Sequence, residues 1–414
     1  MVIKLCFFIV YLTCSLLTFK VSANVSKTDT TIGFTLTSHS TTLNEQRHVK
    51  IYLPESYNHS EQEYPVLYVL DGQWHFTNAV AIQQSLKAPL ATPEMIVVGI
   101  MNKNPDRRTW FSRESDKFEQ YLLKELIPYV DNQYRTQSRK VLFGWEMGAF
   151  FSSSTFLQHP DLFEAVILSS GGEIEDDVLN SFASEIKKDK YIYIANSNRD
   201  VYTIKFADAL SKALSQNNQK KLHWQYDKFD DETHQSTPYL ALYQGIKYIF
   251  HNYSTPTFID IREFKQLGGM KYLTTYFNER SKRFGFENAI HDDTKNHLIW
   301  LSWKQDNYPE FDEFMTEFSD VLTTKRYHSV FWQNNFGLFY LKHDNPTKAE
   351  YFFKSGIGKF PESAKLHNGL GKVYQETGFL NKAKKHYSAA VKFATDKGDN
   401  NLAQYQSDLA SINL

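Results

Sequence analysis

The sequence predicts an α/β protein with a mostly parallel sheet, followed by an all-helical region, and three observations support this prediction. Short apolar runs alternate with segments of helical spacing between residues 64 and 250, as in a sheet that helices cover on both faces. The strand pattern stops after Tyr253, and the remaining residues carry helical spacing and an internal repeat. The chain has 414 residues and 42% hydrophobic content, which suits two or three folded units.

The predicted strands fall into two groups. Residues Thr31 to Tyr52 alternate apolar and polar side chains, as half-buried antiparallel strands do, and Pro54 ends the second run. Continuous apolar runs, which suit a parallel sheet buried on both faces, follow at Tyr64–Gly72, Met95–Ile100, Val141–Phe143, Ala165–Leu168, Tyr191–Ala195 and Leu222–Phe229.

Helical spacing fills the intervals between these runs. Within residues 118–134, four apolar residues recur at steps of four and define one face that packs on a sheet: Phe118, Leu122, Leu126 and Val130. Further helices are predicted from Gly148 onward, over residues 206–214 and over residues 238–250. The alternation predicts helices on both faces of the sheet, in a domain of roughly 230 residues.

The helical region begins after a predicted linker, "STPTFIDIREFKQLGG" at residues 254–269. Residues 298–318 predict a degenerate helix pair, and residues 401–413 predict a terminal cap. Five pairs of positions match at an offset of 34 residues: Gly337 and Gly371, Tyr340 and Tyr374, Ala349 and Ala383, Phe353 and Tyr387, Ile357 and Val391. This period resembles the tetratricopeptide repeat, in which small residues let two helices approach and aromatic residues fill the groove between repeats.

The first 23 residues predict a cleaved export signal, because an apolar run from Leu5 to Phe19 is followed by the small-residue exit Val21-Ser22-Ala23. The mature chain is therefore expected in the periplasm or outside the cell. A lipoprotein anchored through Cys14 is the alternative, although the preceding residues make a poor lipobox. The predicted units are the signal at 1–23, an α/β domain at 24–255, a linker and degenerate helical hairpin at 256–330, and repeats with a capping helix at 331–414.

Composition excludes several classes of site and partner. Both cysteines, Cys6 and Cys14, lie in the leader, so the mature chain forms neither a disulfide nor a thiolate metal site. We expect neither a metal ion nor an organic cofactor. Lysine and arginine number 46 against 47 acidic residues, without a basic run, so nucleic acid is not an expected partner. The apolar run of the leader is too short to span a bilayer comfortably.

The segment from Arg139 to Gly172 has the layout of a strand that turns sharply into a helix and then returns to a second strand. Its turn is Gly144-Trp145-Glu146-Met147-Gly148, where a serine hydrolase has Gly-x-Ser-x-Gly. A turn this tight needs small neighbours, and it holds the central side chain clear of the sheet. Glu146 therefore takes the position of a nucleophile.

Six segments, in the correct order, resemble the esterase family of α/β-hydrolases that includes enterobactin-type esterases, esterase D and feruloyl esterases. They are "RHVKIYLPESY", "YPVLYVLDG", "IVVGIMNKNPDRR", "FEQYLLKELIPYVDNQYRT", "VLFGWEMGAFFSSSTFLQHPDLFEAVILSSGG" and "DKFDDETHQSTPYLALYQGIKYIF", and they span Arg47 to Phe250. The resemblance implies an α/β-hydrolase fold for this part of the chain, which the tetratricopeptide-like repeats follow. It also implies action on carboxylic esters.

The resemblance further implies roles for residues around the elbow. His234 matches the family's general base, and Asp200 is the candidate for the acid that orients it. One oxyanion donor would be the backbone N–H of Met147, and another would come from the loop Asp71-Gly72-Gln73. The alternatives are a structural histidine, a solvated loop aspartate and an ordinary turn glycine at Gly72.

A glutamate at the elbow changes the chemistry of this site. A serine alkoxide is as basic as the leaving alcohol, so the tetrahedral intermediate breaks forward. A carboxylate is far less basic, and the intermediate mostly collapses back to the ester. Deleting the nucleophile of a triad costs about 10⁶-fold in kcat in subtilisin. We therefore expect ordinary ester hydrolysis at Glu146 to be reduced or lost.

Two expectations concern the groups around Glu146. If Glu146 and His234 meet, they should pair as carboxylate and imidazolium. Arg107 and Arg108 offer charge that would offset the acids of the cleft, although paired arginines in a loop are more often solvated. Five serines near the elbow are expected to lie inside the following helix or in turns and caps rather than to act as a nucleophile: Ser152, Ser153, Ser154, Ser169 and Ser170.

Three functional hypotheses follow. In the first, the chain is an enzyme in which Glu146 acts as nucleophile or as a general base on water, assisted by His234 and Asp200. In the second, it is a non-catalytic pseudo-esterase that binds a small ester-like ligand, with repeats that hold a protein or peptide partner. In the third, the elbow is unused and only the repeats function.

Overall fold

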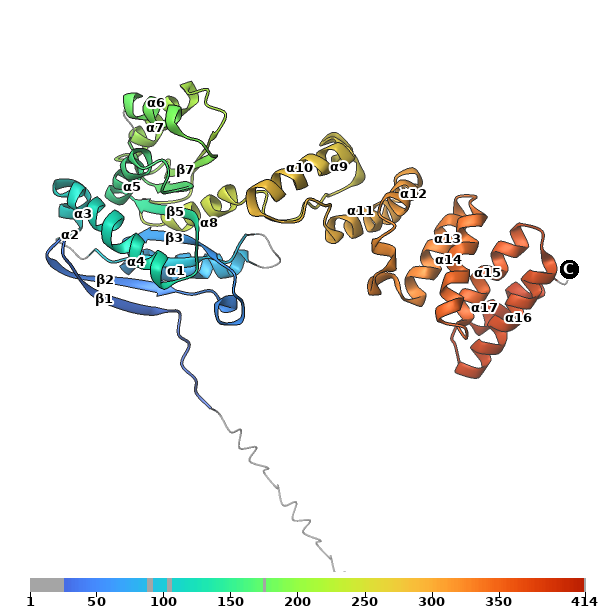
Figure 1. Cartoon of the computed structure of the whole chain (residues 1–414). Helices are drawn as coiled ribbons and strands as arrows, with labels where there is room; N and C mark the ends of the chain where they lie inside the picture. Colours follow the sequence, from blue (N-terminus) through green and yellow to red (C-terminus); the bar gives the residue numbers. More distant parts are fainter. Residues whose placement is uncertain (1–25, 88–91, 103–105, 174–175, 413–414) are drawn as a thin grey trace, which may run out of the picture.

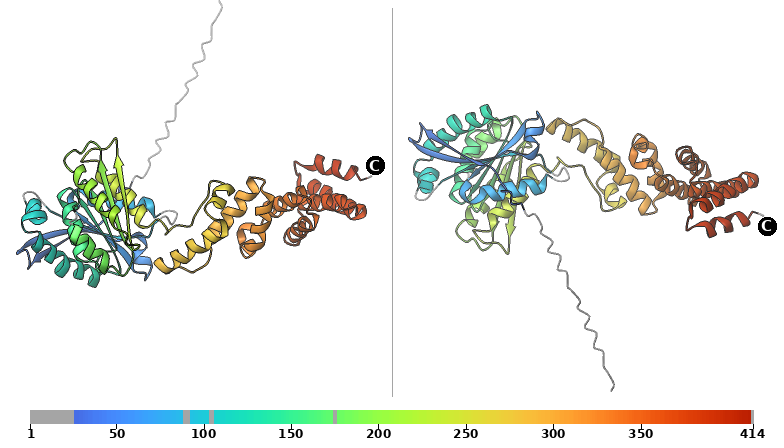
Figure 2. Two further views of the ribbon diagram at one scale, coloured as in Figure 1. Left: turned by 90° about the horizontal axis from the view of Figure 1, so that it is seen from above. Right: turned by 90° about the horizontal axis from the view of Figure 1, so that it is seen from below.

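A computed structural model describes residues 26–87, 92–102, 106–173 and 176–412 (Figure 1). The predicted export signal at residues 1–23 lies outside the described residues. The chain forms an α/β domain, from which a row of helices leads away toward the C-terminus (Figures 1 and 2). Among the helices of the described residues, none combines the length and the apolar character that crossing a bilayer requires.

The α/β domain is built on one eight-stranded sheet with the order β1-β2-β4-β3-β5-β6-β7-β8. The strands are β1 (Phe34–Ser40), β2 (Glu45–Tyr52), β3 (Tyr64–Leu70), β4 (Ile96–Ile100), β5 (Thr136–Trp145), β6 (Ala165–Ser169), β7 (Lys190–Ser197) and β8 (Leu222–Phe229). β1 pairs antiparallel with β2, and β2 antiparallel with β4, whereas the other neighbours are parallel. The predicted mostly parallel sheet is confirmed.

Both faces of the sheet are buried, as the continuous apolar strands predicted. In β3, Val66 and Tyr68 belong to one core cluster, whereas Leu67 and Val69 belong to the cluster on the opposite face. The helices of this domain are α1 (Gly72–Leu86), α2 (Asp106–Arg108), α3 (Ser115–Tyr121), α4 (Ile127–Gln133), α5 (Met147–Gln158), α6 (Asp176–Glu185), α7 (Ile204–Gln216) and α8 (Thr237–Ile249), with short π-helical segments η2 (Thr109–Arg113) and η3 (Leu122–Leu126). Helices α1 and α8 cover one face, and α3 to α7 cover the other.

The helix predicted over residues 118–134 is present, but it is not uniform. It comprises the end of α3, the π-helical η3 and α4. The four apolar residues at steps of four are all buried, with exposed fractions between 0% and 5%. The apolar stripe thus meets the core despite the change of helical register, because a single π-helical turn shifts the helix by one residue without interrupting it.

The helical region contains α9 (Ile261–Gln266), α10 (Gly269–Phe284), α11 (Asp292–Lys304), α12 (Tyr308–Glu317), α13 (Val330–Lys342), α14 (Pro346–Lys359), α15 (Ala364–Glu376), α16 (Leu380–Lys397) and α17 (Leu402–Ala410). The prediction of a linker throughout residues 254–269 was wrong, because α9 forms within it. Asp260 caps this helix by accepting a hydrogen bond of 2.7 Å from the backbone N–H of Glu263. Ile261 and Phe264 are buried in the helical core.

The pairs α13–α14 and α15–α16 repeat one packing contact at the offset of 34 residues. A Cβ atom added to Gly337 would lie 2.6 Å from the ring of Phe353, and one added to Gly371 would lie 2.6 Å from the ring of Tyr387. Both distances are too short for a real Cβ contact, so an aromatic ring occupies the space above each glycine. The sequence match at these positions therefore reflects matching helix contacts.

Replacing Gly371 by alanine is expected to destabilise the last helix pair by about 1–3 kcal/mol, because the added methyl group collides with the Tyr387 ring. Gly358→Ala in α14 is the matched control, since nothing lies within 4 Å of its added Cβ. The control should be neutral or stabilising by up to about 1 kcal/mol. Urea unfolding of the three proteins measures the difference, and equal stability of both variants would contradict the contact.

Candidate active site

The elbow joins β5 to α5 through a single residue, Glu146. Its φ of 51° and ψ of −117° lie in a region that non-glycine residues rarely adopt. A Cβ at Gly144 would lie 2.2 Å from the carbonyl oxygen of Gly148, so the turn requires a glycine at 144. At Gly148 the nearest atom to an added Cβ is 3.5 Å away, which leaves room for a methyl group. Of the two predicted small neighbours, Gly144 is the one that sterics demand.

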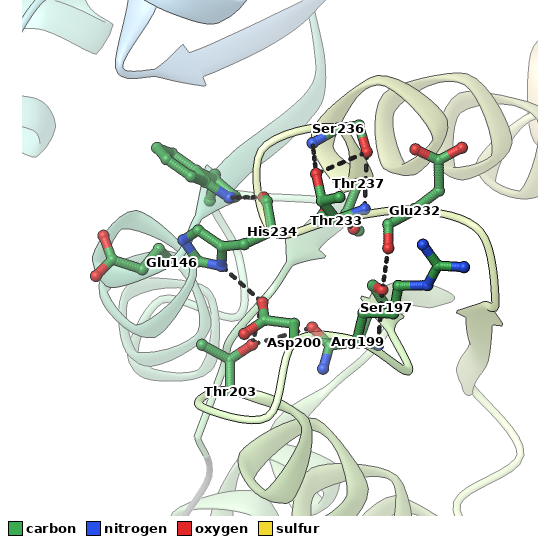
Figure 3. Close-up of polar contacts among 12 residues, drawn as sticks. Glu146, Ser197, Arg199, Asp200, Thr203, Glu232, Thr233, His234, Ser236 and Thr237 are labelled. Atoms are coloured by element: carbon green, nitrogen blue, oxygen red, sulfur yellow. Dashed lines mark hydrogen bonds and ion pairs between the residues drawn. The ribbon is translucent and has the colours of Figure 1, made fainter.

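His234 and Asp200 form a hydrogen-bonded pair across the loops that follow β8 and β7. The distance from His234 Nδ1 to Asp200 Oδ2 is 2.6 Å (Figure 3). The same carboxylate oxygen accepts a hydrogen bond of 2.7 Å from Thr203 Oγ1. Burial disfavours the charged carboxylate, but the hydrogen bonds from His234 and Thr203 outweigh burial and lower the pKa of Asp200. The ionised carboxylate holds Nδ1 of the imidazole, so Nε2 is the nitrogen left to act as a base.

The loop that carries His234 is fixed on both sides. Trp145 donates a hydrogen bond of 3.0 Å from Nε1 to the carbonyl oxygen of His234, and its ring packs on the imidazole with centroids 4.9 Å apart. Ser197 Oγ donates to the carbonyl oxygen of Glu232 on the other side (Figure 3). These contacts hold the imidazole beside the elbow, because Trp145 is the residue that precedes Glu146.

Glu146 pairs with Arg107 and not with His234. Arg107 Nη1 lies 2.5 Å from Glu146 Oε2, and Arg107 Nη2 donates to the carbonyl oxygen of Trp145 at 3.0 Å. Figure 3 shows the Glu146 carboxylate extending away from the imidazole ring. The expected pairing of Glu146 with His234 is therefore wrong. The physical reason is that a permanently charged guanidinium, already beside the elbow, is a stronger partner than an imidazole.

Asp71 completes a row of three charges, of which Asp71 and Arg107 are buried and Glu146 is partly exposed. Arg107 Nε lies 3.0 Å from both carboxylate oxygens of Asp71. The guanidinium is 8% exposed, the Asp71 side chain 0% and the Glu146 side chain 33%. Trp74, Phe111 and Trp145 surround the guanidinium, with ring centroids 5.3–5.7 Å from its central carbon. Arg108 is exposed. The expectation that paired loop arginines are solvated is therefore met by Arg108 but not by Arg107.

The ion pairs of Asp71 and Arg107 were not predicted from the sequence, where Asp71 was named as part of the oxyanion loop and Arg107 as charge that would offset the acids of the cleft. Asp71 follows β3 directly, and Arg107 follows β4. Neighbouring parallel strands bring their carboxyl ends to one edge of the sheet, where the elbow after β5 also lies. The positions of Asp71 and Arg107 after neighbouring strands could therefore have indicated that the two residues meet at this edge.

Burial raises the pKa of Asp71 to about 6, and Arg107 opposes this rise. Folded Asp71 therefore binds a proton at a pH where the unfolded aspartate has lost it, and the contribution of Asp71 to stability falls as pH rises from 4 to 6. Compared with Asp71→Asn, the wild type should lose about 2–3 kcal/mol of unfolding free energy over this interval. Urea unfolding of both proteins at pH 4, 5, 6 and 7 tests this. A constant difference would show that Asp71 does not titrate there.

The predicted oxyanion donors lie at the starts of two helices. Met147 begins α5, and Gly72 and Gln73 begin α1, so their backbone N–H groups belong to helix N-termini, which favour negative charge. A Cβ on Gly72 would lie 2.4 Å from the carbonyl carbon of Gly99, so close packing explains this glycine. Gln73 Nε2 donates to the carbonyl oxygen of Asn102 at 2.7 Å and fixes the loop.

The serines near the elbow do not replace a nucleophile. Ser152 and Ser153 are buried within α5, and Ser153 Oγ donates to the carbonyl oxygens of Phe150 and Glu173. Ser169 and Ser170 are buried at the end of β6. Among the residues that the structure describes, no serine hydroxyl is hydrogen-bonded to the His234 ring. No cluster of three or more histidine, cysteine or acidic side chains suited to a metal ion occurs there either.

Comparison with known proteins supports the esterase resemblance of the α/β domain. Residues 40–242 match the family model described as Putative esterase. Uncharacterized protein YjcH of Bacillus subtilis (strain 168) is 28% identical over 209 residues, which is 46% of this chain and 85% of the relative.

Two crystal structures show the fold. An IroE-like serine hydrolase from Shewanella oneidensis matches with a TM-score of 0.51 and 23% identity, over 69% of this chain and 99% of its own. An uncharacterised protein from Capnocytophaga ochracea matches with a TM-score of 0.55 and 16% identity, over 90% of this chain and 99% of its own. The first domain therefore has the α/β-hydrolase fold, and the second match extends into the helical region.

Proposed function

We propose that the α/β domain is a pseudo-esterase, which binds an ester-like ligand beside the elbow without carrying out ordinary ester hydrolysis. The observation that carries this proposal is the 2.5 Å ion pair between Arg107 Nη1 and Glu146 Oε2. A carboxylate nucleophile attacks through an oxygen lone pair and is weakened when a cation engages that group. Here the guanidinium engages the carboxylate, and Asp71 holds the guanidinium from its other side.

Two chemical effects at Glu146, one from the carboxylate itself and one from its ion pair, act in the same direction. A carboxylate is already a better leaving group than an alkoxide, so its adduct with an ester reverts. Charge-assisted hydrogen bonding to Arg107 lowers its electron density further. His234 therefore has no alcohol to deprotonate, and the Glu146 carboxylate stays paired with Arg107.

The remaining parts of the site support ligand binding. The His234–Asp200 pair is intact, and the N-termini of α1 and α5 offer backbone N–H groups toward a carbonyl oxygen. The Trp74 ring is 48% exposed beside Trp145, which provides an aromatic surface for the apolar part of a small ester-like ligand.

The helical region supplies the second half of the proposed function. Its repeated contacts, Gly337 on Phe353 and Gly371 on Tyr387, support a tetratricopeptide-like array that binds a protein or peptide partner. The leader at residues 1–23 supports export to the periplasm or beyond. On this account the protein presents a ligand-binding domain and a partner-binding arm outside the cytoplasm.

Turnover of short-chain aryl esters by the purified mature chain tests the pseudo-esterase proposal. The wild type should hydrolyse them no faster than about threefold above His234→Ala, because the general base has no nucleophile to activate. Epoxides and alkyl halides, tested in parallel, examine attack by Glu146 at saturated carbon. Ester turnover that disappears in His234→Ala would overturn the proposal and establish an enzyme.

A further inference from the structure

A cavity lies at the opposite edge of the sheet from Glu146 and His234. It has a volume of about 720 Å³ and is lined by residues of the α/β domain and of α10. On the α/β side, its lining belongs to the amino-terminal ends of β5, β6, β7 and β8. It is thus separate from the elbow and is formed jointly by the two parts of the chain.

The floor of this cavity holds more positive than negative charge. Arg139 Nη1 and Arg283 Nη2 each lie 2.8 Å from the same oxygen, Glu164 Oε1. The side chains of these three residues are 11–17% exposed. Lys190 is 6% exposed, and its ammonium donates to the neutral carbonyl oxygen of Phe163 at 2.7 Å. One carboxylate therefore faces two partly buried guanidiniums and one buried ammonium.

This imbalance is costly without a further anion. Burial lowers the pKa of Arg139 and that of Lys190, since desolvation disfavours their charged forms. Arg283 Nε is buried and has no hydrogen-bond partner within the described residues. Buried charges and donors are normally paired. The terminal nitrogens of both guanidiniums also donate to neutral protein oxygens: Arg139 Nη2 to the carbonyl of Arg283 at 2.6 Å, Arg283 Nη1 to Asn252 Oδ1 at 3.0 Å, and Arg283 Nη2 to the carbonyl of Ile249 at 2.6 Å. The floor thus has one spare donor, Arg283 Nε, as well as spare charge.

The rim has one more carboxylate than ammonium groups, but all of these side chains are exposed, so solvent screens them from the floor. It carries exposed side chains of both signs: Lys188 and Lys282 against Asp161, Asp189 and Glu279. His223 Nε2 lies 3.1 Å from Asp189 Oδ1, which ties that carboxylate to the outer wall. The wall is flat and aromatic, because the rings of Tyr191 and His223 stack with centroids 4.9 Å apart. The guanidinium of Arg283 lies over the Tyr191 ring at 4.1 Å.

We propose that this cavity binds a doubly charged oxyanion of the phosphate type between the two parts of the chain. Two guanidinium forks and one ammonium are the donors that proteins use for such anions. Arg283 belongs to α10, whereas Arg139 and Lys190 belong to the α/β domain. A bound anion therefore strengthens the joint between the domain and the helical arm.

Calorimetric titration of the mature full-length chain with inorganic phosphate, at constant ionic strength, tests this proposal. Wild type should bind saturably, and Arg283→Gln should bind at least tenfold more weakly. Glu164→Gln should bind at least threefold more tightly, because it removes the competing carboxylate. Arg262→Gln makes the same charge change on a side chain that is 79% exposed outside the cavity, and should leave affinity unchanged.

Arg283→Gln and Glu164→Gln are expected to change phosphate affinity in opposite directions if the cavity is an anion site. A purely structural joint instead predicts no phosphate binding in any of these proteins. If Arg283→Gln does not fold, Lys190→Gln takes its place, with an expected loss of at least threefold. Phenyl phosphate, whose ring would lie on Tyr191 and His223, distinguishes an organic phosphate from the free anion by tighter binding. Absence of saturable phosphate binding by wild type, or equal affinities in all variants, would overturn the proposal.

Discussion

Replacing Arg107 by glutamine is expected to lower the free energy of unfolding by about 3–5 kcal/mol at pH 8, because removing one partner of a buried ion pair leaves the other charge uncompensated. The charge left without its partner is the Asp71 carboxylate, whose side chain is 0% exposed. At pH 5 the loss should be smaller, since Asp71, whose pKa is already about 6, then takes up a proton. Urea unfolding at both pH values measures the effect.

Arg108→Gln is the matched control for this prediction. It changes the same charge at the next residue, but Arg108 is exposed, so a change within about 0.5 kcal/mol is expected. If both variants lost the same stability, the charge row Asp71–Arg107–Glu146 would not contribute as described. If Arg107→Gln lost the same unfolding free energy at pH 5 and at pH 8, the titration of Asp71 would not contribute to the loss.

Replacing Glu146 by serine is expected to raise the turnover of short-chain aryl esters by about 10²-fold or more over wild type. The expectation rests on the roughly 10⁶-fold cost of losing a nucleophile, of which an unoptimised site recovers part. The His234–Asp200 pair is already in place to deprotonate a hydroxyl at the elbow, and Arg107 retains Asp71 as its partner. Steady-state rates at saturating ester measure the gain.

Two further variants define what the gain means. Glu146→Gln removes the charge without adding a nucleophile, so it should remain as inactive as wild type. The double variant Glu146→Ser with His234→Ala should lose the gain, because no base then activates the serine. Activity in Glu146→Gln, or in the double variant, would point to a different nucleophile.

The fold was predictable because its signals are local and repeated. Continuous apolar strands such as residues 165–168 and the stripe through Phe118 and Val130 each report burial in several residues at once. The strand order and the α9 helix were not predictable in this way. Strand order depends on long-range pairing, and α9 rests on a single cap at Asp260 and two buried side chains.

The site was predictable in its positions but not in its pairing. Backbone positions after strands fix where Glu146, Asp200 and His234 lie, and the structure brings Asp200 to His234. The partner of Glu146 depended on side-chain direction and on competition between Arg107 and His234, which sequence spacing does not encode. Glu146 pairs with Arg107 because this arginine is buried beside the elbow and Asp71 fixes its guanidinium.

Labelling with a fluorophosphonate, followed by intact-protein mass spectrometry, tests the central claim most directly, because this reagent records an activated serine without requiring a substrate. We predict no adduct on wild type, one adduct on Glu146→Ser, and none when that change is combined with His234→Ala. A stoichiometric adduct on wild type would show that another hydroxyl lies against His234 and would contradict the account.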